Sequence, residues 1–176
     1  MIIAITGTPG TGKTELGKEL ALRKMNVIFL SDFIRENGLL GEYDGEMGTY
    51  DVETEELDAA LEEFSVLPET YYAEGHLSHF LTCSAVIVIR CDPDVLAARL
   101  AERGYGEEKV KENVQAEILD VILCEADSSD IPVYELDSTS RTSGELADSV
   151  LEISDGKVEP YLPGKTDWTG GIDRWF

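Results

Sequence analysis

The chain has 176 residues and a mass of 19.4 kDa, the usual size of one domain, so we expect no separate substrate domain. Apolar residues make up 43% and charged residues 28% of the chain, which excludes wholesale disorder. The net charge of -22 disfavours strong direct binding of nucleic acid, because an acidic surface repels phosphate backbones. A basic protein partner or a salt-rich cytoplasm would each account for this charge.

Compartment is predicted from apolar runs and cysteines. The longest apolar run, residues 85–89, is far shorter than the roughly 18 residues that span a bilayer, and the first residues lack a basic leader. Three cysteines form no C-x-x-C pair, so we expect buried thiols in a reducing compartment and no metal cluster. We therefore expect a cytoplasmic protein without a membrane partner.

The first half of the chain alternates short apolar runs with helical periodicity. Its predicted elements are a strand over 2–6, a helix over 14–24, a strand over 27–30, a helix capped by Ser31 or Asp32 through Glu36, an irregular stretch over 38–49 and a helix over 53–64. The helix over 14–24 follows a glycine cluster. The helix over 53–64 ends before a proline, which disfavours further helix.

The second half continues the alternation. Its predicted elements are a strand over 70–73, a brief helix over 76–81, a strand over 85–90, a helix from Asp92-Pro93 toward Arg103, a helix over 107–126, a strand over 132–136 and a helix over 144–153. Residues 155–176 follow neither period. Five strands that alternate with helices predict an α/β fold with a parallel sheet covered on both faces.

A phosphate-binding loop is the strongest motif. Residues 7–14 match G-x-x-x-x-G-K-[ST] between the first strand and the first helix, where backbone N–H groups and the helix dipole can bind phosphate. We expect Lys13 to reach the β- and γ-phosphates of ATP or GTP and Thr14 to ligate Mg²⁺. An ordinary Gly-rich turn would need neither side chain.

Asp32 and Arg35 are the candidate acceptor-binding residues. They follow the second strand at the carboxyl edge of the sheet, where open α/β folds bind ligands. No Lys or Arg occurs between Glu36 and Ile89, so Arg35 is the guanidinium available to a second phosphate there. The alternative is a surface arginine paired with a neighbouring acid.

Arg99 and Arg103 lie four residues apart before Gly104-Tyr105-Gly106, so both can face one cleft. Two cations beside a glycine hinge are suited to a lid that neutralises the charge of phosphoryl transfer and excludes water. The alternative is a solvated charged face.

The third predicted strand is followed by Glu74-Gly75-His76. An acid there can hold a Mg²⁺-bound water, and His76 can orient a water or relay a proton. A histidine bonded to backbone is the alternative for His76, and His79 is favoured as structural.

Four segments together resemble the adenylate kinase isoenzyme 6 type family, nuclear and archaeal enzymes that also act in small ribosomal subunit assembly. They are GTPGTGKT at 7–14, EGH at 74–76, RLAERGY at 99–105 and KENVQAEI at 111–118. The resemblance, closest to an archaeal member, covers residues 1–153. It implies a three-layer P-loop NTPase fold of the nucleoside monophosphate kinase type, with a monophosphate region at about 30–53, a lid at about 102–112 and a tail at 154–176.

The resemblance also implies activity and partners. It implies transfer of the ATP γ-phosphate to AMP with Mg²⁺, some ATPase activity, a role in rRNA maturation and a small-subunit ribosomal protein of the S11 type as partner. By the same resemblance, the residues on ATP are Gly10, Thr11, Gly12, Lys13, Thr14, Glu15 and Arg103. The chain departs from the family pattern, Asp-x-His, at Glu74. The tail has no counterpart, and its Trp168 and Trp175 either staple it to the core or form a docking patch.

Three functions remain open at this point: an adenylate kinase, an ATP-driven assembly switch with little kinase activity, and a kinase for another nucleotide or small metabolite. Lys13, Arg99, Arg103 and His76 are the candidate catalytic residues, and Lys13 is expected to be required in all three functions.

Overall fold

The computed structural model describes residues 1–44, 49–128 and 130–176. Its strands are β1 (Ile2–Thr6), β2 (Asn26–Phe29), β3 (Tyr43–Asp44), β4 (Thr49–Tyr50), β5 (Tyr71–Glu74), β6 (Ala85–Arg90) and β7 (Val133–Asp137). Its α-helices are α1 (Lys13–Leu22), α2 (Leu30–Glu36), α3 (Thr54–Ser65), α4 (Pro93–Glu102), α5 (Glu107–Ile118), α6 (Val121–Asp127), α7 (Ser143–Ser154) and α8 (Ile172–Trp175). Three short 3₁₀ turns cover Ser78–Phe80, Glu159–Tyr161 and Thr169–Gly171.

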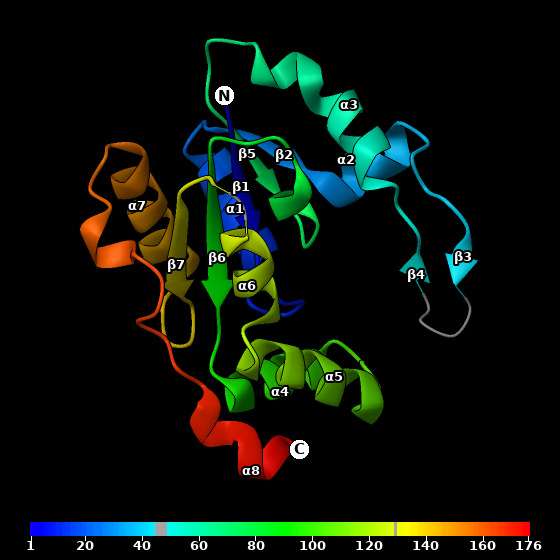
Figure 1. The fold of residues 1–176 in the computed structure, drawn as a ribbon, viewed down its shortest axis with the longest axis vertical. Coiled ribbons are helices and arrows are strands. Elements are labelled where there is room, and N and C mark those ends of the chain that lie inside the picture. Colours follow the sequence, from blue (N-terminus) through cyan, green and yellow to red (C-terminus); the bar gives the residue numbers. More distant parts are fainter. Residues whose placement is uncertain (45–48, 129) are drawn as a thin grey trace.

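Five parallel strands form the main sheet in the order β2-β5-β1-β6-β7. All their carboxyl ends meet at one edge, with α4 and α5 beyond it (Figure 1). The strand β5 pairs with β1 in the register Ile5↔Glu74. This pairing places Glu74 beside the end of β1, as the sequence predicts for the third strand, and the five-stranded α/β sheet is confirmed.

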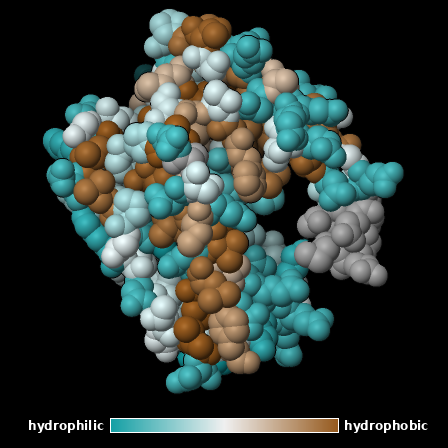
Figure 2. Space-filling model, viewed as in Figure 1, coloured by the Kyte–Doolittle hydropathy of each residue, from teal (hydrophilic) through white to brown (hydrophobic). Residues whose placement is uncertain are grey.

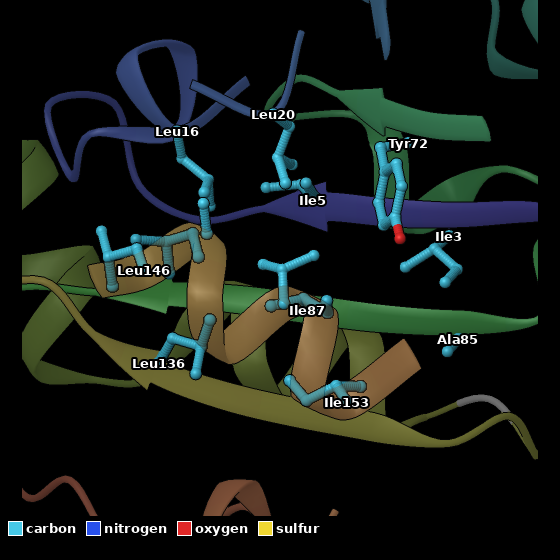
Figure 3. Packing of buried hydrophobic residues seen from close by; sticks show 13 residues of the cluster. Ile3, Ile5, Leu16, Leu20, Tyr72, Ala85, Ile87, Leu136, Leu146 and Ile153 are labelled. Carbon is cyan, nitrogen blue, oxygen red and sulfur yellow. The ribbon is translucent and has the colours of Figure 1, made fainter. Parts of the chain in front are cut away.

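The sheet is the middle layer of three. On one face, α1 and α7 contribute Leu16, Leu20, Leu146 and Ile153 to a cluster with Ile5 and Ile87 of the central strands (Figure 3). The other face is covered by α2 and α3 over β2 and β5, and by α6 over β6. A further cluster joins α4 to α5. Alternating strand residues therefore pack against opposite helical layers, which buries both faces.

Helix starts follow local capping chemistry where side chains allow it. Asp92 caps α4 and accepts from the backbone N–H groups of Asp94 and Val95, with Pro93 at the first helical position. A capping box of Thr142 and Glu145 begins α7. The prediction for the start of α2 was wrong by two or three residues: the helix begins at Leu30, and Phe29, not Ser31 or Asp32, occupies the cap position without a side-chain bond.

The predicted long helix over 107–126 was also wrong. In the structure α5 ends at Ile118, and a second helix, α6, begins at Val121. Asp120 between them has a left-handed backbone with φ of 54°. The guanidinium of Arg90 binds the Asp120 carboxylate and donates to the Glu117 carbonyl at 3.1 Å, which stabilises the break. A tertiary ion pair therefore overrides the helical periodicity.

The tail packs against the α4–α5 pair (Figure 1). Trp168 and Trp175 contact that cluster, and the Gln115 amide donates to the Trp175 carbonyl at 2.7 Å. These contacts favour a role for the two indoles in holding the tail to the core over a role as a docking patch. Figure 2 shows apolar residues gathered in a strip on the viewed face, running toward the end where α8 lies.

The cysteines correct a further prediction. Cys91 is buried and Cys83 is half-buried, but Cys124 is exposed on α6. Burial raises the pKa of the Cys83 and Cys91 thiols to about 11, so both are neutral at physiological pH. None of the three is in a disulfide. No helix among the described residues is both long and apolar enough to cross a bilayer.

Candidate active site

The loop between β1 and α1 has the backbone that its glycines predict. Gly7 has φ of 139°, and a Cβ atom there would lie 2.3 Å from the Ile89 carbonyl oxygen. Gly10 has φ of 95°, and its Cβ would lie 2.8 Å from a methyl group of Leu96. A side chain at either position would therefore displace the loop from β6 or from α4.

Lys13 begins α1 and is 7% exposed. Its ammonium donates to the carbonyl oxygens of Gly7 at 2.6 Å and Thr8 at 3.0 Å, so the side chain folds back over the loop. Burial lowers the pKa of Lys13 to about 8, while the nearby carboxylates of Glu74 and Glu117 oppose that shift. The loop thus holds a cation that an anionic ligand would stabilise in its charged form.

Thr14 and Glu74 meet beside this cation. The Thr14 hydroxyl donates to Glu74 Oε1 at 3.2 Å, and the Glu74 residue is 6% exposed at the end of β5. Burial raises the pKa of Glu74, and Lys13 and the Thr14 hydroxyl oppose that shift. A hydroxyl and a carboxylate are hard oxygen donors of the kind that bind Mg²⁺ together with phosphate oxygens, so these two residues fit that ion.

The two histidines lie in different surroundings. His79 is buried, and its Nδ1 lies 2.9 Å from the Thr6 hydroxyl while its Nε2 lies 3.1 Å from a Glu125 carboxylate oxygen. His76 is exposed at the end of β5, and its carbonyl accepts from the Thr6 hydroxyl at 3.3 Å. Partial desolvation, Lys13 and His79 together lower the pKa of His76, so its ring is neutral near pH 7. His79 therefore has a structural role, whereas the His76 ring is open to solvent.

A pocket of about 240 Å³ adjoins the glycine loop. It is lined by Gly10, Thr11, Gly12, Glu15, Arg99, Arg103, Ser138, Arg141, Ser143 and Leu146. Three arginines therefore line one pocket beside the loop, which suits an anionic ligand in an otherwise acidic protein. Arg99 and Arg103 come together here, as the sequence expects from their spacing.

The arginines of this pocket differ in what holds them. Arg99 donates to the Ser138 carbonyl at 3.0 Å, and the Ser138 hydroxyl donates to the Thr11 carbonyl at 2.6 Å. Arg103 is exposed at the end of α4. Arg141 donates to the Glu145 carbonyl at 2.6 Å. Sequence reasoning missed Arg141 and Ser138, although polar residues after the last strand of a parallel sheet are a usable signal for ligand contact.

Asp32 and Arg35 lie on α2 on the other side of the loop. Their side chains form an exposed ion pair with Arg35 Nη2 2.6 Å from Asp32 Oδ1. Figure 2 shows a hollow in the surface, with α2 and α3 on one side of it and α5 on the other. Arg35 is therefore near enough to solvent to exchange its partner for an incoming anion.

A buried ionic network lies behind the loop. Arg90 pairs with Glu117 at 2.7 Å and with Glu135 at 2.6 Å, and each of these three side chains is 2% exposed. Its third partner is Asp120. Burial lowers the pKa of Arg90 and the three carboxylates raise it, with a net rise, so the group stays charged. Sequence reasoning missed this network, because its members lie far apart in the chain.

Comparison with known proteins identifies relatives of this chain. A model described as an AAA domain matches residues 3–120. A Methanocaldococcus jannaschii protein named "putative adenylate kinase" is 41% identical over 170 residues, covering 96% of this chain and 93% of its own. A Thermococcus gammatolerans protein of the same name is 41% identical over 175 residues, covering 99% of this chain and 96% of its own.

Solved structures share the fold at low identity. Shikimate kinase from Bacteroides thetaiotaomicron has a TM-score of 0.59 and 20% identity, covering 89% of this chain and 98% of its own. Deoxyadenosine kinase from M. mycoides has a TM-score of 0.56 and 15% identity, covering 89% of this chain and 100% of its own. The fold is that of the P-loop kinases.

Proposed function

The chain belongs to the archaeal adenylate kinase-like family, and on that premise we propose that it transfers the γ-phosphate of ATP to AMP with Mg²⁺. One observation carries the proposal. Lys13, Thr14 and Glu74 converge at the start of α1, between an arginine-lined pocket and a second, open side that carries Arg35. A transferase needs two anion-binding sides around one phosphate cradle, whereas a simple hydrolase needs one.

On the ATP side, the loop and Lys13 hold the β- and γ-phosphates, and the N-terminus of α1 adds its partial positive charge. We assign Gly10, Thr11, Gly12, Lys13, Thr14, Glu15 and Arg103 to ATP. When bound through Thr14 and, by way of a water, Glu74, Mg²⁺ would neutralise phosphate charge and orient the oxygens. Arg99, fixed by the Ser138 carbonyl, and Arg103 stabilise charge on the transferring group.

On the acceptor side, Arg35 and Asp32 bind AMP, within a monophosphate region at about 30–53. A phosphate oxygen of AMP attacks the γ-phosphorus in line, the bond to the β-γ bridging oxygen breaks, and two ADP result, so no covalent enzyme intermediate is needed. The lid at about 102–112 includes the Gly104 turn and the first part of α5, and we propose that it excludes water. Residues 45–48 of the monophosphate region lie outside the described residues.

Phosphorus NMR of the purified protein with ATP, Mg²⁺ and AMP tests the transfer. ADP should form much faster with AMP than without it. CMP, GMP and UMP in competition rank the acceptors and test the alternative of a kinase for another nucleotide. Equal ADP formation with and without AMP would remove the transferase proposal.

A second candidate is an ATP-hydrolysing assembly switch that acts in small ribosomal subunit maturation in the cytoplasm. The net charge of -22 favours it, because such a surface attracts a basic protein such as an S11-type ribosomal protein. In this activity His76, neutral and open to solvent, orients the attacking water. A pull-down of the ribosomal protein by this chain, done once with ATP and once with ADP, tests the switch. Equal capture with the two nucleotides argues against it.

A further inference from the structure

Thr8 is a hydrogen-bonding centre within the glycine loop. Its carbonyl accepts from Lys13 Nζ at 3.0 Å, from the Thr11 hydroxyl at 2.9 Å and from the Thr11 backbone N–H at 3.2 Å. The side chain is buried, and its hydroxyl donates to Glu117 Oε2. The residue that shapes the loop around Lys13 is therefore itself held from outside the loop.

Both oxygens of Glu117 are used as acceptors. Oε1 accepts from Arg90 Nε at 2.7 Å and from the Cys91 backbone N–H at 3.1 Å, and Oε2 accepts from Thr8. A carboxylate provides two such oxygens, whereas an amide provides one acceptor and one donor. A glutamine at position 117 would direct its NH₂ group either toward the Thr8 hydroxyl or toward Arg90 and Cys91, where a donor already points.

We propose that Glu117 is a positioning residue for ATP, which fixes Thr8 and thereby holds the glycine loop in the conformation that receives phosphate. The proposal rests on the proposed use of ATP. Glu117 lies in α5, beyond the lid residues, and Gly10 packs against Leu96 and Leu100 of α4. The loop is thus fastened at two points to the α4–α5 pair, and its shape is set before ATP arrives.

One alternative is that Glu117 serves only as a counter-ion for Arg90; its charge also favours the ammonium form of Lys13, an effect that Thr8→Val leaves unchanged. Glu135 provides the matched control for this alternative. It accepts from Arg90 Nη1 at 2.6 Å and its side chain is as buried as that of Glu117. Its other oxygen, however, accepts from backbone N–H groups of the tail at Gly164 and Lys165. Loss of charge at 135 also removes a buried counter-ion of Arg90 while leaving the Thr8 contact in place.

The test measures the affinity for MgATP by calorimetry and the KM for ATP, the KM for AMP and kcat in the full-length protein. We expect Glu117→Gln and Thr8→Val each to weaken ATP binding about ten-fold, as loss of a hydrogen bond to a charged group implies, with the KM for AMP unchanged. The double variant should bind MgATP no more weakly than Glu117→Gln alone, because the two changes remove the same hydrogen bond between Thr8 and Glu117. Glu135→Gln should lower the melting temperature but keep the ATP affinity within about two-fold.

Wild-type-like ATP affinity in Thr8→Val and Glu117→Gln, additive effects in the double variant, or equal loss in Glu135→Gln would each overturn the proposal. If Glu117→Gln does not fold, Thr8→Val carries the test, since it leaves the bonds of Glu117 to Arg90 and Cys91 intact. Thr8→Ser, which keeps the hydroxyl, should then weaken binding less than Thr8→Val. A wild-type protein that binds no MgATP would instead overturn the proposed function, which separates the two failures.

Discussion

Glu135 joins the C-terminal tail to the sheet, because its Oε2 accepts from the backbone N–H of Gly164 at 3.0 Å. Its Oε1 binds Arg90, so the tail is connected through a buried ion pair to the elements behind the glycine loop. The tail then continues across α4 and α5, where Arg174 pairs with Asp94 at 2.6 Å. The tail is therefore part of the folded structure rather than an appendage.

Trp175→Ala should lower the free energy of unfolding by about 2 to 4 kcal/mol, because it leaves a cavity against the α4–α5 cluster. Urea denaturation followed by circular dichroism measures the change. Phe176→Ala is the control: its side chain is exposed, and the expected change is within about 0.5 kcal/mol. Equal stability of wild type and Trp175→Ala would contradict a stapling role for the tail.

Lys13→Ala should reduce phosphoryl transfer by roughly three orders of magnitude or more, since it removes a charge that the transition state requires. A coupled assay of ADP formation measures the loss. Lys157→Ala, at an exposed position paired loosely with Glu152 at 3.7 Å, should leave the rate unchanged. Near-normal turnover in Lys13→Ala would show that another group supplies this charge.

The affinity for ATP should fall as the pH rises above about 8. The pKa of Lys13 is about 8 in the free protein, below the ordinary 10.5, so its ammonium loses the proton above that pH. Phosphate binding favours the charged form and raises this pKa, so ATP binding should take up a proton between about pH 8 and 9. Calorimetry in buffers of different ionisation enthalpy detects the uptake. Its absence would place Lys13 away from the phosphates.

Glu74→Gln should raise the Mg²⁺ concentration needed for half-maximal activity, because it removes the negative charge that favours the ion beside Thr14. A titration of activity against Mg²⁺ measures the shift. Glu74→Asp keeps the charge, so it should retain more activity than the amide variant. If both variants need the same Mg²⁺ concentration as wild type, Glu74 does not serve the ion.

Arg35→Ala should raise the KM for AMP about ten-fold or more, because it removes the guanidinium on the acceptor side, while the KM for ATP stays the same. Steady-state kinetics with each nucleotide varied in turn measures both values. Glu36→Ala, at the adjacent exposed position, is the control for local damage to α2. A change in the KM for ATP instead would place Arg35 on the opposite side from that proposed.

The local elements were largely predictable. The strand β6 matches its predicted bounds, because an unbroken β-branched run reads as a buried parallel strand. The glycine loop was predictable because its motif is contiguous, so spacing alone defines the backbone that Gly7 and Gly10 require. The Asp92-Pro93 start of α4 was predictable for the same reason, since a cap acts within three residues.

The break in the predicted long helix and the structure of the tail came from contacts between distant residues. The periodicity over residues 107–126 continues through Asp120, but Arg90 binds that side chain and the helix ends. The tail has no period of its own and obtains its structure from α4 and α5. Neither contact leaves a signal at short range.

The amino-acid sequence by itself determined the five-stranded α/β sheet and the loop that carries Lys13, because hydrophobic period and motif spacing act within a few residues. The tertiary structure alone decided which carboxylates share Arg90, that Glu117 holds Thr8, and that Arg141 joins Arg99 and Arg103. The physical reason is burial. Ion pairs and hydrogen bonds become strong when folding removes them from water, and only the completed fold selects which distant groups are buried together.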